Sequence, residues 1–171
     1  LKGSDYLLAA YSNILDSDPG FFQIDRQANL SIDELRTVLQ DDHGNCPMPA
    51  IDLHLSEARA YGEDMLKLGV TPIDIINKTN ESSTPPADFL RLLWHIGGYK
   101  NDPLQKKSTL LAYILVNRPE MFLEPAPEEE LLPCIDYHLM RSALRTGMVN
   151  IINDDLRSQI CLLYTSPSPR D

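Results

Sequence analysis

The chain has 171 residues, a formal net charge of −10 and a hydrophobic content of 43%. This length and composition favour one folded domain with a sizeable core, and no apolar run approaches the length of a membrane span. The negative charge argues against tight binding of undamaged duplex DNA, because such binding depends on neutralising phosphates with lysine and arginine.

Only Cys46 and Cys134 precede the last eleven residues, so we expect no disulfide framework and a reduced, cytoplasmic setting. The last eleven residues, CLLYTSPSPRD, lack periodicity and match a translated sequencing adapter. We therefore expect residues 161–171 to be an adapter-derived artefact and the natural protein to continue past Ile160 with a different sequence. Residues 1–160 are then expected to be a fragment of a single helical domain.

Helical periodicity dominates the chain, and no segment shows the alternation typical of a strand. The first predicted helix covers residues 4–15 and ends at Asp18-Pro19-Gly20. Its apolar stripe contains Leu7, Leu8, Tyr11, Ile14 and Leu15. A second helix is predicted over residues 31–40, where Ser31 and Glu34 have the spacing of a capping box. Its predicted buried residues are Ile32, Leu35, Val38 and Leu39.

A longer helix is predicted over residues 50–68, with Gly69 as its C-cap. Its expected inner face contains Ile51, Leu55, Ala58, Met65 and Leu66. Thr71-Pro72 begins a short helix, since proline is favoured at the first helical position. Residues 77–86 are predicted to form a polar loop.

The next helix is predicted over residues 87–96, with Trp94 in the core, and Gly97-Gly98 ends it. Another helix is predicted over residues 103–118, and it must end before Pro119. An extended acidic segment then leads to a helix that begins after Pro133 and ends at Gly147. A last helix begins near Asn153. The sequence therefore predicts an all-α fold of seven or eight short helices.

The turn between the helices at 87–96 and 103–118 is a first candidate for chemistry. Gly97-Gly98, followed by Lys106 and Lys107, resembles a degenerate helix-hairpin-helix turn, in which glycine lets backbone amides approach a phosphate. An ordinary turn with solvated lysines is the alternative. A lysine near the N-terminus of a helix meets the positive end of the helix dipole, which makes its neutral form easier to reach.

Asp136 is a second candidate, because it falls at the start of the helix that follows Pro133. There the helix dipole stabilises a carboxylate by about 0.3–1 kcal/mol. Asp136 is therefore either a capping residue or a carboxylate directed at a reaction. The pair His43 and Cys46 is too small a ligand set for zinc, so we expect no metal and no cofactor.

Taken in order, these motifs resemble the queuosine salvage proteins, which are N-glycosidases that release the base queuine from queuosine 5′-phosphate. The counterparts of the family pattern are the segment from Ile32 to Leu39, Met48-Pro49, Lys106 and Asp136-Tyr137. The resemblance implies a fold like that of helix-hairpin-helix DNA glycosylases. It also implies a small-molecule nucleotide substrate.

The same resemblance assigns roles to individual residues. Asp136 and Lys106 are the implied catalytic pair, and the implied substrate-binding residues are Lys107, Gly97, Gly98 and Tyr137. Archaeal 8-oxoguanine DNA glycosylases also resemble this segment, with a lysine-led apolar helix and an aspartate at a later helix start. A non-catalytic helical interaction module is the remaining alternative.

Overall fold

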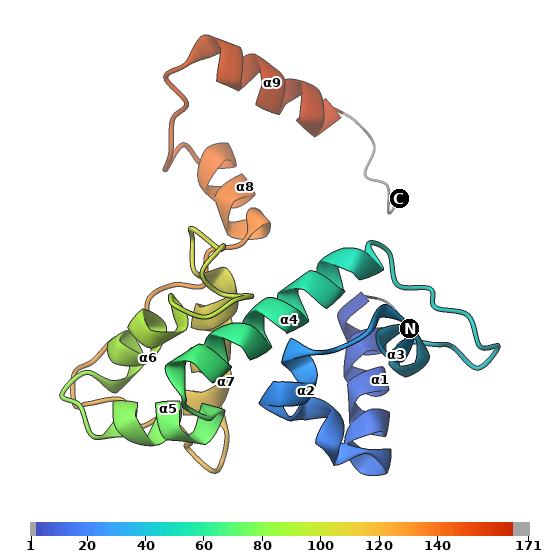
Figure 1. Ribbon diagram of the computed structural model, residues 1–171. Coiled ribbons are helices and arrows are strands. Elements are labelled where there is room, and N and C mark those ends of the chain that lie inside the picture. Colours follow the sequence, from blue (N-terminus) through green and yellow to red (C-terminus); the bar gives the residue numbers. More distant parts are fainter. Residues whose placement is uncertain (1–2, 166–171) are drawn as a thin grey trace. The chain divides into compact units, whose positions relative to one another are not determined.

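Helices account for all the regular secondary structure of residues 3–165, which are the residues that this computed structural model describes (Figure 1). Side chains are described for residues 3–160. The predicted all-α fold class is therefore confirmed. The chain divides into two compact units, Leu1–Cys134 and Ile135–Asp171, and each unit is described by itself. Whether residues 1–160 belong to a single domain stays a prediction.

The first unit contains seven α-helices and one short 3₁₀ helix within residues 3–134. They are α1 (Gly3–Ser17), η1 (Pro19–Phe22), α2 (Ile24–Ala28), α3 (Ile32–Val38), α4 (Ile51–Leu68), α5 (Pro72–Asn80), α6 (Pro85–Leu93) and α7 (Lys106–Asn117). The second unit contains α8 (Tyr137–Arg145) and α9 (Asp154–Thr165). Of the predicted artefact, residues 161–165 continue the backbone of α9, and residues 166–171 lie outside the described residues.

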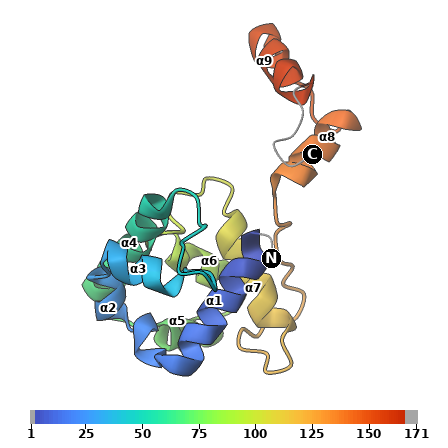
Figure 2. The same ribbon diagram turned by 90° about the vertical axis from the view of Figure 1, so that its right-hand side faces the viewer.

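Helix α4 runs between α1–α3 on one side and α5–α7 on the other (Figures 1 and 2), and it contributes to two apolar clusters. The first half of α4 packs against a cluster formed by Phe21, Leu30, Leu35 and Leu39. Its second half contributes Met65 to a larger cluster, which also contains Ile75, Phe89, Leu90, Leu93, Ile96, Ala112 and Leu123. Because α4 contributes to both clusters, it connects the two groups of helices within the first unit.

The predicted apolar faces of two helices were wrong at three positions. In α1, Leu7, Tyr11 and Ile14 pack against the first cluster, whereas Leu8 and Leu15 are 70% and 54% exposed. In α4, Leu66 is 51% exposed although its neighbour Met65 is buried. Each misplaced leucine directly follows a packed residue, and successive residues of a helix point about 100° apart.

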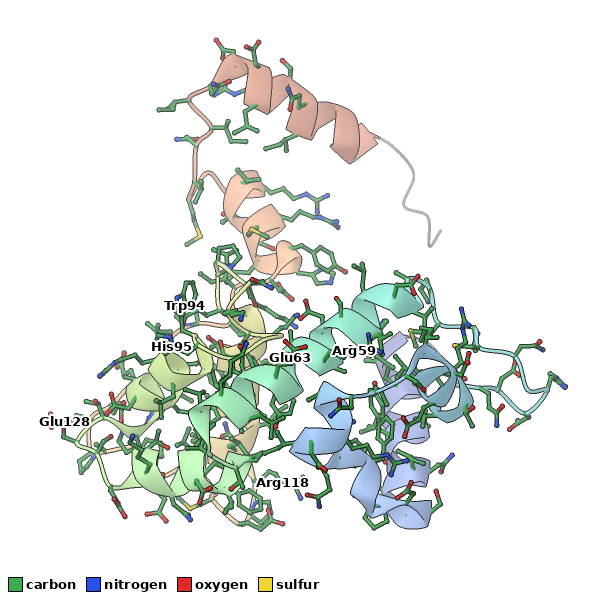
Figure 3. The ribbon with its side chains drawn as sticks, in the orientation of Figure 1. Arg59, Glu63, Trp94, His95, Arg118 and Glu128 are labelled. Atoms are coloured by element: carbon green, nitrogen blue, oxygen red, sulfur yellow. The ribbon has the colours of Figure 1, made fainter. Side chains whose placement is uncertain are left out.

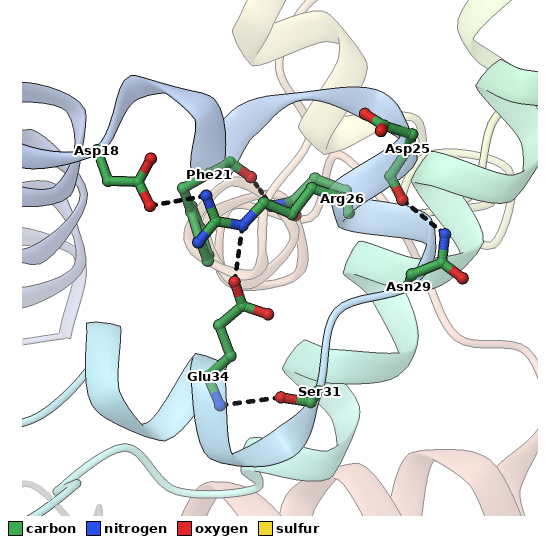
Figure 4. A network of polar contacts seen from close by, with 8 residues as sticks. Asp18, Phe21, Asp25, Arg26, Asn29, Ser31 and Glu34 are labelled. Carbon is green, nitrogen blue, oxygen red and sulfur yellow. Dashed lines mark hydrogen bonds and ion pairs between the residues drawn. The ribbon is translucent and has the colours of Figure 1, made fainter.

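The segment between α1 and α3 forms η1 and α2, neither of which we predicted. Arg26 of α2 organises it, since its guanidinium donates to Asp18 at 2.7 Å and to Glu34 at 2.7 Å (Figure 4). Ser31 caps α3 as predicted, because its hydroxyl accepts the backbone amide hydrogen of Glu34. The carboxylate of Glu34 forms an ion pair with Arg26, and this ion pair joins α2 to α3.

The predicted polar loop at residues 77–86 is much shorter than expected. Residues 77–80 complete α5, and Pro85 begins α6. Thr79 is buried, and its hydroxyl donates to the carbonyls of Ile75 and Ile76, which explains how a polar residue fits this position. The predicted start of α5 is confirmed, with Thr71 and Asp74 forming a reciprocal capping box.

Candidate functional site

The turn that joins α6 to α7 is fixed by the close approach of Gly97 to α4. A methyl group on Gly97 would lie 2.3 Å from the carbonyl carbon of Ala60 and 2.5 Å from its Cβ. No side chain fits in this space, so glycine is required here for packing. Gly98 has a positive φ of 84°, which makes it the conformational glycine of the pair.

Asp64 of α4 holds the same turn from within the first unit. Its carboxylate accepts the backbone amide hydrogen of Gly97 at 2.9 Å and the ammonium of Lys100 at 2.5 Å. The bond to Lys100, the charge of Lys100 and the amide of Gly97 lower the pKa of Asp64, although burial of the carboxylate opposes them. A helix-hairpin-helix turn offers backbone amides of this kind to a phosphate, but the amide of Gly97 already donates to the carboxylate of Asp64.

Lys107 closes the other side of the turn. Its ammonium donates to the carbonyl of Gly98 at 3.0 Å and pairs with the carboxylate of Glu57 at 3.4 Å. Its backbone amide donates to Asp102 at 2.9 Å, which places a negative charge at the N-terminal end of α7. This carboxylate offsets the unfavourable position of two lysines at the positive end of a helix dipole.

Lys106 is the first residue of α7 and is half-buried. Within residues 3–160 its ammonium has no hydrogen-bond or ion-pair partner in the structure. Its carbonyl accepts the thiol of Cys134 at 3.6 Å, and the carbonyl of Leu131 accepts the hydroxyl of Tyr113 at 3.5 Å. The segment 131–134 therefore lies along α7 and brings the end of the first unit beside Lys106.

Asp136 is the N-cap residue of α8, in the second unit. Its carboxylate accepts the backbone amide hydrogen of Leu139 at 2.9 Å, so the anion is held at the positive end of the helix. Tyr137 follows and is 51% exposed, with its ring centroid 3.8 Å from that of His138 and 5.5 Å from the guanidinium carbon of Arg141. Asp136 and Tyr137 thus begin one helix, as the sequence predicts.

The structure therefore brings Lys107 into contact with Gly98, next to Gly97, in the first unit, and Lys106 begins the same helix as Lys107. Asp136 and Tyr137 belong to the second unit. The pairing of Asp136 with Lys106 stays a prediction. Two carboxylates in the network around the turn, Asp64 and Glu57, have no sequence motif that could have marked them.

The prediction that Trp94 lies in the core is wrong, because its side chain is 41% exposed. Leu93 and Ile96 take the buried positions around it, and Trp94 lines an open groove with His95 and Gln105. Figure 3 shows Trp94 and His95 next to each other at the end of α6. An aromatic residue next to a histidine was a usable signal, but the apolar pattern of α6 concealed it.

The described residues contain no group of three or more metal-ligating side chains that could hold an ion. Among their helices, none is both long and apolar enough to cross a membrane. Comparison of the chain with family models, with curated proteins and with solved structures gives no match. The functional assignment therefore depends on the motifs of the sequence and on the contacts around Lys106 and Asp136.

Proposed function

We propose that this chain is an N-glycosidase that hydrolyses the glycosidic bond of queuosine 5′-phosphate and releases the free base queuine. One observation carries the proposal. The carboxylate of Asp136 accepts the backbone amide hydrogen of Leu139 and is held at the start of α8, and Lys106 is the first residue of α7. An oriented carboxylate and a lysine at a helix start are the two groups that this reaction requires.

The carboxylate of Asp136 suits the charge that develops during the reaction. When the bond between the anomeric carbon and the base nitrogen breaks, positive charge builds up on the sugar. Asp136 stabilises that charge and orients a water molecule toward the anomeric carbon. The water oxygen forms the new bond to the sugar and gives up a proton, and the departing base nitrogen gains a proton.

Lys106 is the proposed partner of Asp136. As a cation at the edge of the site, its ammonium neutralises the 5′-phosphate or donates a proton to the leaving base. Lys107 and Tyr137 are proposed to contact the substrate, and the Gly97-Gly98 turn positions Lys107 through the bond from its ammonium to the Gly98 carbonyl. No metal or cofactor has a step in this reaction.

The test is a direct assay of base release. The purified chain is incubated with queuosine 5′-phosphate, and free queuine is separated by chromatography and quantified over time. Duplex DNA containing one 8-oxoguanine serves as the competing substrate. Release of queuine without excision of 8-oxoguanine supports the proposal. Excision of 8-oxoguanine without release of queuine assigns the chain to DNA repair, and the absence of both reactions favours a non-catalytic interaction module.

A further inference from the structure

An open groove of about 390 Å³ lies in the first unit, between the end of α6 and the start of α7. Its lining includes Leu90, Arg91, Trp94, His95, Gln105 and Leu132. All of these residues precede Ile135, so the groove is formed within one unit. Gln105 directly precedes Lys106, which places the groove next to the lysine of the proposed catalytic pair.

The apolar part of the groove is unusual because it exposes a tryptophan. Trp94 is the chain's single tryptophan and is 41% exposed, and Leu132 in the same groove is 62% exposed. Leaving such side chains in water forfeits the free energy of burying them. An indole face that stays accessible in a concave site is suited to stacking on a planar ring.

The polar part of the groove provides hydrogen-bonding groups of both kinds. Gln105 offers an amide that both donates and accepts, and His95 offers an imidazole. Arg91 adds a guanidinium that pairs with Asp88 on the same helix and is 72% exposed. A flat apolar wall beside mixed donors and acceptors matches a heteroaromatic ring that carries polar groups along its edge.

The turn beside the groove fixes the backbone conformation of Gln105. Gln105 has a positive φ of 52°, a conformation that costs a non-glycine residue free energy. The neighbouring turn maintains it, since Asp102 accepts the amide hydrogens of Leu104 and Lys107 on either side of it. Gln105 lines the groove from this turn.

We infer that this groove is a nucleobase subsite, in which the ring of a free base or nucleotide stacks on Trp94 while His95 and Gln105 bind its polar edge. The inference rests on the proposed function for the identity of the ligand, but binding is measured without turnover. The net charge of −10 favours a small ligand over a base presented by a polynucleotide.

Tryptophan fluorescence tests the inference directly, because Trp94 is the only source of this signal. We expect 7-deazaguanine to quench the emission saturably at concentrations at which ribose 5-phosphate has no effect. Free N-acetyltryptophanamide, titrated in parallel, corrects for absorption by the ligand. Absence of saturable quenching up to millimolar 7-deazaguanine overturns the inference. Equal quenching by a single-stranded oligonucleotide at the same base concentration overturns the assignment to a free ligand.

Matched variants locate the binding, with affinity measured by equilibrium dialysis. Trp94→Leu removes the aromatic face and is expected to weaken 7-deazaguanine binding roughly tenfold or more, whereas Trp94→Phe stays within a few-fold. His95→Ala is expected to weaken binding, and His54→Ala, a histidine on α4 outside the groove, is not. Circular dichroism melts verify that all four variants are folded. Equal affinities for Trp94→Leu and the unmodified chain would place the ligand elsewhere.

The base-release assay separates this inference from the proposed function. Queuine release without quenching of Trp94 leaves the glycosidase proposal in place and removes the base from this groove. Quenching without queuine release supports the groove as a base subsite and removes the proposed reaction. If Trp94→Leu reduces both queuine release and the affinity for 7-deazaguanine measured by equilibrium dialysis, the two proposals are supported together.

Discussion

The carboxylate of Asp64 on α4 accepts the backbone amide hydrogen of Gly97, at a nitrogen–oxygen distance of 2.9 Å. This hydrogen bond ties the turn between α6 and α7 to the helix that both apolar clusters share. It also gives the amide of Gly97 an anionic partner from the chain itself. The cations left for a substrate near this turn are therefore Lys106 and, in part, Lys107.

Replacing Asp64 by asparagine should destabilise the fold. The amide can still accept from Gly97, but it cannot compensate the charge of Lys100, which contacts the carboxylate at 2.5 Å. Loss of a hydrogen bond to a charged group in a largely buried place typically costs about 1.5–3 kcal/mol. Urea unfolding at pH 7 measures the change, and Asp102→Asn serves as a control at a less buried carboxylate. A loss below that of the control would contradict the role of Asp64.

The contribution of Asp64 should depend on pH in a defined direction. The pKa of its carboxyl is lowered below its ordinary value of 3.8, mainly by the hydrogen bond from Lys100. The ionised form therefore stabilises the folded state fully above pH 3.8, and this stability is lost as the pH falls through the folded-state pKa. The difference in unfolding free energy between the unmodified chain and Asp64→Asn should stay constant from pH 7 to 5 and shrink below about pH 4. A difference that grows on acidification would show that the pKa is raised.

The two glycines of the turn should differ in their tolerance of alanine. In Gly97→Ala the new methyl group would lie 2.3 Å from the backbone of Ala60, so α4 and the turn must separate. Such overpacking costs about 1–3 kcal/mol or more. In Gly98→Ala the nearest atom to the new methyl group would be a carboxylate oxygen of Glu57 at 3.5 Å. The strain would therefore come from the positive φ alone, at about 1–2 kcal/mol. Thermal melts of the two variants give the comparison. Equal melting temperatures would mean that the close approach to Ala60 is not present in solution.

Substitutions of the two lysines at the start of α7 should have different effects, one on the rate of base release and the other on stability. Lys106→Met is expected to lower the rate of base release roughly 100-fold, the effect of losing a group that acts on the leaving base. Its stability should change by less than about 0.5 kcal/mol. Lys107→Met removes the bond to Gly98 and an exposed ion pair with Glu57, so its main effect should be a small loss of stability. A larger loss of activity in Lys107→Met than in Lys106→Met would show that Lys107, and not Lys106, is the partner of Asp136.

The charge of the chain predicts its behaviour with nucleic acid. Tight binding to duplex DNA needs several lysine or arginine contacts to phosphate, and the net charge of −10 opposes them. An undamaged duplex should not be retarded in a gel-shift assay at roughly 1 µM protein, even at low salt. Retention that weakens steeply as salt is added would show a basic surface that the net charge conceals.

The long helices were predictable from the sequence because their signals are local. Periodicity, the Thr71-Pro72 helix start and the Gly69 C-cap placed α4 and α5, and Pro119 correctly limited α7. The short elements η1 and α2 were not predictable, because they depend on Arg26 meeting Asp18 and Glu34 from two other segments. Local propensity contains no information about such contacts.

The candidate site was likewise predictable only in part. The helix start at Asp136 followed from Pro133 and the apolar pattern after it, whereas α7 begins at Lys106 and not at residue 103 as predicted. The role of Asp64 and the groove at Trp94 could not be predicted from the sequence. Each depends on which face of a helix packs against a neighbouring element. A shift of one position along α6 turns a core tryptophan into a surface one, and periodicity alone rarely resolves that shift.

The measurement that tests the central proposal most directly is the rate of queuine release by Asp136→Asn, together with its stability. Asparagine caps a helix about as well as aspartate, so the bond from the Leu139 amide should persist and stability should change by well under about 1 kcal/mol. If the carboxylate stabilises the developing cation, the rate should fall by about 10²–10³. A normal melting temperature with this loss of turnover is the predicted result. A variant that releases queuine within a few-fold of the unmodified chain would show that Asp136 is an ordinary helix cap.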